Sequence, residues 1–134
     1  MREIKFRAKR IDNGEWVHGD LINSHCDMET YIYQEQCIDN STIFLIEVIP
    51  ETIGQFTGLP DKNGVEIYEG DVVKATNTEN VGEIKYISEH SAFVVYSKDE
   101  NGAYYEYMNQ GLTQQYFEVI GNIHDNPELL EEKQ

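Results

Sequence analysis

The stretch that decides the fold runs from Ile53 to Val73 and reads IGQFTGLPDKNGVEIYEGDVV. It combines a segment at 53–58 that contains small residues, a turn at 60–64, and the start of a strand at 67–73. The turn is built from proline, aspartate, lysine, asparagine and glycine. Its glycines predict turns and close backbone approaches, because glycine adopts positive φ at little steric cost. We therefore interpret the stretch as a folding signature, and none of its parts is a catalytic motif.

Alternating apolar and charged residues upstream of this stretch predict an N-terminal β region. Ile4, Phe6 and Ala8 alternate with basic side chains, which is the pattern of a strand with one buried face. The run at 43–49 is apolar enough to be buried on both faces, and Pro50 ends it because proline lacks the amide proton that a central strand needs. The other elements expected in this region are a turn at 12–14, strands at 15–22 and 30–36, and a loop at 23–30.

Short strands joined by polar turns predict a small closed barrel from about residue 49 to residue 123. Its expected strands lie at 72–75, 82–87, 91–97, 104–108 and 117–123, with a short turn or strand at 52–56 and a helical turn at 112–116. Asn126 as N-cap and Pro127 at the first helical position predict a short C-terminal helix. The expected fold is mainly β, with an N-terminal β region at 1–48, a small β-barrel at 49–125 and a helical tail at 126–134.

The net charge of the chain is −15, and it is unevenly distributed. The first ten residues contain five basic side chains and only Glu3 as an acid, which gives this segment +4 and leaves −19 on the other 124 residues. An acidic body repels nucleic-acid phosphates and helps to keep a protein in solution. General DNA or RNA binding is therefore disfavoured, except through the N-terminal segment.

Length and composition are those of a soluble protein with one ordinary domain or two small ones. The chain has 134 residues, of which 40% are hydrophobic, and no run approaches the roughly 18 apolar residues of a membrane span. Its N-terminus carries charge where a signal peptide carries an apolar core, so we expect a cytoplasmic protein. Cys26 and Cys37 stand eleven positions apart, outside any C-x-x-C pair, and are expected to be reduced thiols. One disulfide that closes an exposed loop is the alternative.

Several segments resemble the YopX family of phage and prophage proteins, in the same order along the chain. Besides the stretch at 53–73, they are IKFRA at 4–8 with WVHGDLI at 16–22, and FEVIGNIHDNPELL at 117–130. GDVV at 70–73 also resembles the first strand of Src-homology-3-like small barrels. The resemblance implies an N-terminal β segment followed by a barrel of that type, and it implies no established biochemical activity. The segment at 23–41 carries little of the pattern, so features particular to this member are expected there.

The N-terminal basic strand is the first candidate site. Lys5, Arg7 and Lys9 project from one side of it and have the chemistry to contact phosphate or an acidic partner. A solvated face that pairs with the acidic body, or lysines that discourage edge-to-edge pairing, explains the same residues. The overall negative charge favours this second interpretation.

The tyrosines are the second candidate, because nine in a small chain is a high number and tyrosine is favoured at interfaces. Tyr31 and Tyr33 share one strand face, as do Tyr105 and Tyr107, which makes these two pairs candidates for subunit or partner contacts. Tyrosine is also a good strand former, so half-buried sheet positions are the alternative.

No residues have the spacing of a metal site, and we expect neither a metal nor a cofactor. The four histidines share no ligand spacing, and His25 beside Cys26 supplies only two of the four ligands of a structural zinc site. The DKNG run at 61–64 begins like a calcium loop, but its glycine falls at the fourth place instead of the sixth, so we interpret it as a turn.

Nucleophile, phosphate-binding and dinucleotide-binding motifs are absent from the sequence. Glu66, Glu69 and Asp71 come closest to an acid and base pair, but capping at the start of a strand and solvation explain them.

Three functional hypotheses follow from these patterns. The first is a non-enzymatic binding or assembly protein of phage or prophage origin that self-associates through aromatic strand surfaces, with a host protein as a possible partner. The second is an acidic decoy that occupies the nucleic-acid site of a host protein, and it rests on the charge of −19 outside the first ten residues. The third is an unrecognised enzyme that acts on nucleotides.

Overall fold

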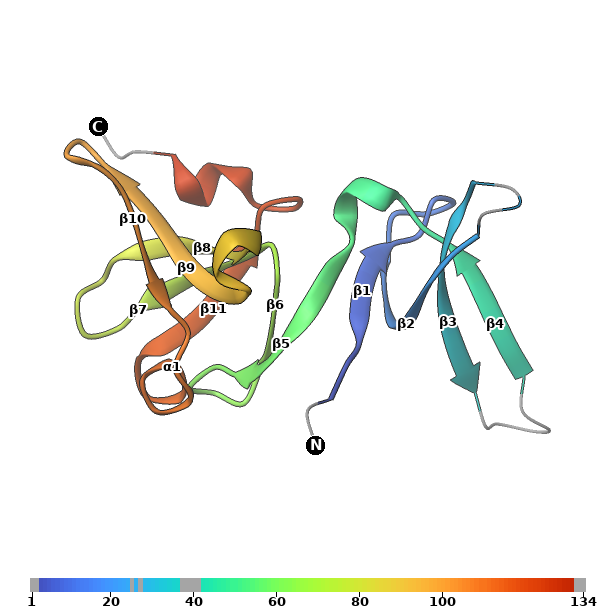
Figure 1. Cartoon of the computed structure of the whole chain (residues 1–134), viewed down its shortest axis with the longest axis horizontal. Helices are drawn as coiled ribbons and strands as arrows, with labels where there is room; N and C mark the ends of the chain where they lie inside the picture. The colour runs from blue at the N-terminus through green and yellow to red at the C-terminus, as the bar shows by residue number, and fades with distance from the viewer. Residues whose placement is uncertain (1–2, 25, 27, 37–41, 132–134) are drawn as a thin grey trace. The chain divides into compact units, whose positions relative to one another are not determined.

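The computed structural model of the protein describes residues 3–24, 26, 28–36 and 42–131, and Figure 1 shows their course. The chain divides into two compact units, Met1–Phe56 and Thr57–Gln134. Strands dominate both units and all their pairings are antiparallel, so the expected mainly β fold is confirmed. No described helix has both the length and the apolar character needed to cross a membrane.

The first unit is an antiparallel sheet with the strand order β4-β3-β2-β1-β5. Its strands are β1 (Phe6–Lys9), β2 (Trp16–Asn23), β3 (Thr30–Gln36), β4 (Thr42–Glu47) and the beginning of β5 (Gly54–Pro60). β1 and β2 form the expected hairpin, with Phe6 opposite Gly19 and Lys9 opposite Trp16. The start of β5 pairs with β1 through Gly54 and Gln55.

One face of this sheet forms the core of the first unit. Ala8, Val17, Ile32 and Val48 are buried together there. The prediction that the strand at 43–49 is buried on both faces is wrong at Leu45, which is 53% exposed. Because the described strands of this unit form one sheet, the face opposite the core has no second strand layer to cover it within the unit.

The second unit is a five-stranded antiparallel sheet with the order β10-β9-β8-β7-β11. Its strands are β7 (Asp71–Ala75), β8 (Val81–Ile87), β9 (Ala92–Asp99), β10 (Gly102–Tyr107) and β11 (Phe117–Asn122), preceded by the end of β5 and by β6 (Glu66–Tyr68). Ile67, Val73, Ile84 and Phe117 belong to its buried core. β10 and β11 are the two ends of this order, and no pairing between described residues joins them. The expected closed barrel is therefore not confirmed.

The turn at 60–64 is fastened by the buried carboxylate of Asp61. Its Oδ1 accepts hydrogen bonds from the amides of Asn63 (2.8 Å) and Val65 (2.9 Å), and its Oδ2 accepts one from the amide of Val119 in β11 (2.9 Å). The amide of Lys62 donates to the carbonyl of Phe117 at 2.9 Å. The folding signature thus anchors the last strand of the sheet, in agreement with its interpretation as a structural element.

The structure places Pro60 differently from the prediction, whereas it confirms the expected role of Asp71. Pro60 was expected in the turn, but it is the last residue of β5. Asp71 is buried, and its carboxylate accepts a hydrogen bond from the amide of Tyr68 at 2.8 Å, which confirms strand-start capping. Gly64 and Gly70 have φ of 84° and 94°, as their turn positions require.

The helical pieces are short. α1 (Gln110–Tyr116) begins two residues before the expected helical turn, because the side chain of Asn109 accepts hydrogen bonds from the amides of Gly111 and Leu112. The C-terminal helix is the 3-10 turn η3 (Pro127–Leu130), with Pro127 in its first turn as expected. Asn126 stands at the expected N-cap position, but its side chain makes no capping hydrogen bond: its Oδ1 accepts a hydrogen bond from the amide of Asn122 instead.

Candidate functional site

Strand β10 is the most exposed strand among the described residues. It lies at one end of the sheet, alongside β9 (Figure 1), and all six residues of its sequence GAYYEY are exposed. β10 pairs with β9 in unbroken register from Gly102 opposite Asp99 to Tyr107 opposite Val94. Because only one of its edges is paired within the described sheet, its other edge presents backbone amides and carbonyls that can bind another strand.

Two of the predicted tyrosines meet on one face of this strand. Tyr105 and Tyr107 are 42% and 55% exposed, with ring centroids 6.2 Å apart. His90, from the 3-10 turn η2 (Ser88–His90), lies against both rings, with centroid distances of 5.5 Å and 5.7 Å. The hydroxyl of Tyr107 is 2.6 Å from Nδ1 of His90, which is hydrogen-bonding distance. The cluster is therefore both exposed and held in place.

The other end of the same sheet is protected. On the outward edge of β11, the carbonyl of Phe117 accepts a hydrogen bond from the amide of Lys62, and the amide of Val119 donates one to the carboxylate of Asp61. Its register against β7 also shifts between Val119 and Gly121, as a β-bulge does. Covering and bulging are two ways in which proteins block edge pairing, and β10 has neither.

The basic residues of the N-terminal strand lie over aromatic rings. The guanidinium carbon of Arg7 is 4.6 Å and Nζ of Lys9 is 5.5 Å from the centroid of the Trp16 ring. Nζ of Lys5 is 5.3 Å from the centroid of the Phe56 ring and 3.5 Å from a carboxylate oxygen of Glu3. Cations in these positions are attracted by the rings and are partly withdrawn from solvent. The basic side chains therefore have local structural roles in addition to any role in binding.

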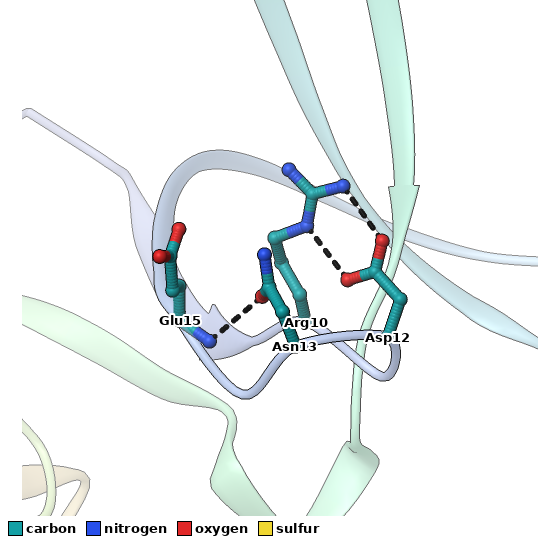
Figure 2. Close-up of polar contacts among 4 residues, drawn as sticks. All are labelled: Arg10, Asp12, Asn13 and Glu15. Carbon is teal, nitrogen blue, oxygen red and sulfur yellow. Dashed lines mark hydrogen bonds and ion pairs between the residues drawn. The ribbon is translucent and has the colours of Figure 1, made fainter.

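Arg10, at the end of the basic segment, is neutralised locally. Its guanidinium donates two hydrogen bonds of 2.9 Å to the carboxylate of Asp12, as Figure 2 shows. This hydrogen-bonded pair raises the pKa of Arg10 and lowers the pKa of Asp12. In the same turn the amide of Glu15 donates to the side chain of Asn13 at 2.9 Å. The positive charge available to an anionic ligand is consequently smaller than the sequence suggests.

Tyr31 and Tyr33 lie on the face of the N-terminal sheet opposite its core. They flank the fully buried Ile32 in β3, so alternation turns both away from the core. Tyr31 pairs with Ile22 of β2, and Tyr33 pairs with Leu45 of β4. Both tyrosines are half-buried, in line with the alternative that they are ordinary sheet residues.

The strand registers bring most of the predicted residues of the first unit onto one face. Arg7 is opposite His18, and Lys9 is opposite Trp16. Further along β2, Asp20 and Ile22 lie on the same face as Trp16 and His18, because alternate residues of a strand share a face. Asp20 and Ile22 are opposite Tyr33 and Tyr31, so the tyrosines lie on this face too. Four of the seven predicted binding residues thus share this outer face, namely Arg7, Lys9, Tyr31 and Tyr33. Lys5 belongs to the same unit but precedes β1, outside these registers. The other two belong to the β10 cluster of the second unit.

Sequence reasoning missed His90 and the edge position of β10. His90 was considered as a turn residue and as a metal ligand but not as a partner of the tyrosines, since nothing local connects it with tyrosines fifteen and seventeen residues away. Within the described residues, no three His, Cys, Asp or Glu side chains converge to hold a metal ion. Cys26 is an exposed free thiol, whereas residues 25, 27 and 37–41, which include His25 and Cys37, lie outside the described residues.

Comparisons with known proteins relate the whole chain to one family. The model of the YopX protein family matches residues 5–131. The crystal structure of protein EF1440 from Enterococcus faecalis is similar, with 27% sequence identity and a TM-score of 0.53, over 98% of this chain and 100% of that chain. None of the curated proteins compared with the chain matches it. Since the family match extends from the first strand to the final 3-10 turn, the chain belongs to the YopX family.

Proposed function

We propose that this protein is a non-enzymatic binding and assembly protein that self-associates through the exposed edge of β10. The observation that carries the proposal is the exposure of all six β10 residues at an end of the sheet. The fixed cluster of Tyr105, Tyr107 and His90 supports it, because rigid aromatic side chains contribute much of the binding energy at interfaces. The phage or prophage origin and the Src-homology-3-like character of the second unit, both implied by resemblance, belong to the same proposal.

The sequence of β10 carries few of the features that prevent edge pairing. It has no lysine and no proline, its register is regular, and Glu106 is its only charged residue. An edge strand of this kind presents unpaired backbone amides and carbonyls, and it is protected from uncontrolled association when a partner strand pairs with that edge. A second copy is the partner that is always present, and antiparallel pairing about a two-fold axis would satisfy both edges at once.

The charge of Glu106 selects among the possible registers. An axis at Glu106 would place two carboxylates directly opposite each other, which is destabilising. An axis at Tyr105 instead pairs Tyr105 with Tyr105 of the second copy and Tyr104 with Glu106. Cross-strand aromatic pairs contribute about 0.2–1 kcal/mol each, so we favour the register centred on Tyr105.

The test is a charge substitution in the edge. Tyr105→Lys is expected to give a monomer, because lysine on an edge strand opposes pairing. Leu112→Lys is the matched control: it makes the same change of charge at a residue of α1 that is 50% exposed, and it should associate like the wild type. Sedimentation equilibrium over a wide concentration range measures the outcome. A wild-type protein that stays monomeric throughout, or a Tyr105→Lys variant that associates equally well, would refute the proposal.

A further inference from the structure

The second unit contains a groove that no part of the proposed assembly uses, apart from Tyr104 at its margin. It lies between β8, β9 and the 3-10 turn η3 and has a volume of about 430 Å³. Sites for small molecules commonly have volumes of about 300–1,000 Å³. The groove is therefore large enough to hold a ligand of that size.

Apolar and aromatic side chains form part of the walls of the groove. Leu129 and Leu130 of η3 line one side, and Val81, Tyr96 and Tyr104 contribute from the strands. Leu130 is 39% exposed and Tyr104 is 47% exposed, so part of this apolar surface is open to water. A ligand with an apolar portion would gain free energy by covering it.

The charged residues that line the groove are mainly acidic. The lining residues include three glutamates, Glu79, Glu83 and Glu131, and one cation, Lys98. Glu79 is already paired with Lys74, whose Nζ is 3.7 Å from its carboxylate. Glu83 is half-buried, and burial raises its pKa, although the nearby Lys85 opposes the shift and Glu69 adds to it. A carboxylate in this position is stabilised by an added positive charge.

Two residues that line the groove already interact with a cation of the protein. Glu83 and Tyr96 are cross-strand partners, and Nζ of Lys85 lies 4.4 Å from the centroid of the Tyr96 ring. A ring face beside a carboxylate favours an ammonium or guanidinium group over an anion. The charge of −15 on the whole chain also raises the local concentration of cations.

We propose that this groove binds an ammonium or guanidinium group on an apolar stem, with Glu83 as the charge partner and with Leu129, Leu130 and Tyr104 packed against the stem. A lysine or arginine side chain of a partner protein has this chemistry, and so has a free aliphatic amine. The site does not depend on β10 pairing, so a monomeric protein would leave this proposal standing.

Three probes test the site, with binding measured by calorimetry and by changes in backbone amide chemical shifts. Agmatine represents a free cation, acetyl-Gly-Arg-Gly-amide represents an arginine in a chain, and the citrulline form of the tripeptide has nearly the same shape without the charge. Agmatine and the arginine tripeptide should bind and shift the amides of Val81, Glu83 and Ser97, whereas the citrulline tripeptide should not. If the tripeptide binds at least tenfold more tightly than agmatine, the natural source is a protein; equal affinities indicate a free amine.

Substitutions decide whether Glu83 is the charge partner. Glu83→Gln should weaken agmatine binding about tenfold, since a charge-assisted contact is lost from a half-buried position. Glu89→Gln removes the same charge from an exposed residue of η2 outside the groove and should change affinity less than twofold. Leu130→Lys should abolish binding by placing an ammonium group of the protein's own in the groove. Equal losses from Glu83→Gln and Glu89→Gln, equal binding of the citrulline tripeptide, or unchanged binding to Leu130→Lys would overturn the proposal.

Discussion

At the scale of single residues, two buried carboxylates explain why the GLPDKNG and EGDVV segments have their sequences. Asp61 and Asp71 are only 3% and 2% exposed, and backbone amides surround their oxygens. A buried charge is tolerated only where hydrogen bonds replace its hydration. The turn at 60–64 could be predicted from its residue types. The hydrogen bond from the amide of Val119 to Asp61 could not, because it joins positions 58 residues apart.

Asp61→Asn is expected to destabilise the protein by about 2 kcal/mol. The amide group has one acceptor oxygen instead of two, so either the turn or the amide of Val119 loses its partner. Urea unfolding gives the change in the free energy of unfolding. Asp20→Asn, at an exposed position of β2, is the control and should change it by less than about 0.5 kcal/mol. Similar values for the two variants would show that the Asp61 bonds contribute little.

Glu83 gives the stability a defined dependence on pH. Burial raises its folded pKa above the ordinary value of 4.5, so the folded state binds a proton more tightly than the unfolded state. Its ionisation therefore destabilises the fold as the pH rises from 4.5 through the folded pKa, and this loss is absent at lower pH. Glu83→Gln should raise the thermal unfolding midpoint more at pH 7 than at pH 4. An identical difference at both values would contradict this account.

At the scale of elements, local alternation of apolar and polar residues predicted the positions of the strands in the sequence well. It predicted the order of the strands within the sheets much less well. The hairpin of β1 and β2 follows from alternation on either side of the Asp12–Gly14 turn, which the sequence displays. β5 runs past Gly58 and ends only at Pro60, although both residues locally indicate a break, because its pairing partners override that preference. The edge position of β10 depends on the order of strands that are distant in sequence, so no local pattern could reveal it.

Two glycines test how tightly the second sheet is packed. A Cβ at Gly82 would come within 2.7 Å of Ser97 Oγ and of Val95 Cγ1, so Gly82→Ala should destabilise the protein by about 1–3 kcal/mol. Gly111 lies in α1, where a Cβ would meet only the Asn109 side chain at 3.5 Å. Gly111→Ala should therefore stabilise the protein by up to about 1 kcal/mol through helix propensity. Thermal unfolding measures both, and equal tolerance of alanine at the two positions would disprove the close packing at Gly82.

At the scale of the whole molecule, the two ends of the second sheet differ, and the charge is strongly negative. β11 is covered and bulged, whereas β10 is open, regular and rich in tyrosine. A net charge of −15 opposes contact between copies at long range, so association requires a short-range surface that compensates for the repulsion. The β10 edge provides such a surface through backbone hydrogen bonds and tyrosine pairs.

Hydrogen exchange of residues 102–107 at low and high protein concentration tests self-association through β10 most directly. We expect amide exchange in this segment to slow as the concentration rises, while α1 exchanges at a constant rate, because pairing protects only the amides of the edge. In Tyr105→Lys the segment should exchange at the fast rate at both concentrations. Exchange of 102–107 that is independent of concentration in the wild type, with or without association elsewhere, would contradict the proposal.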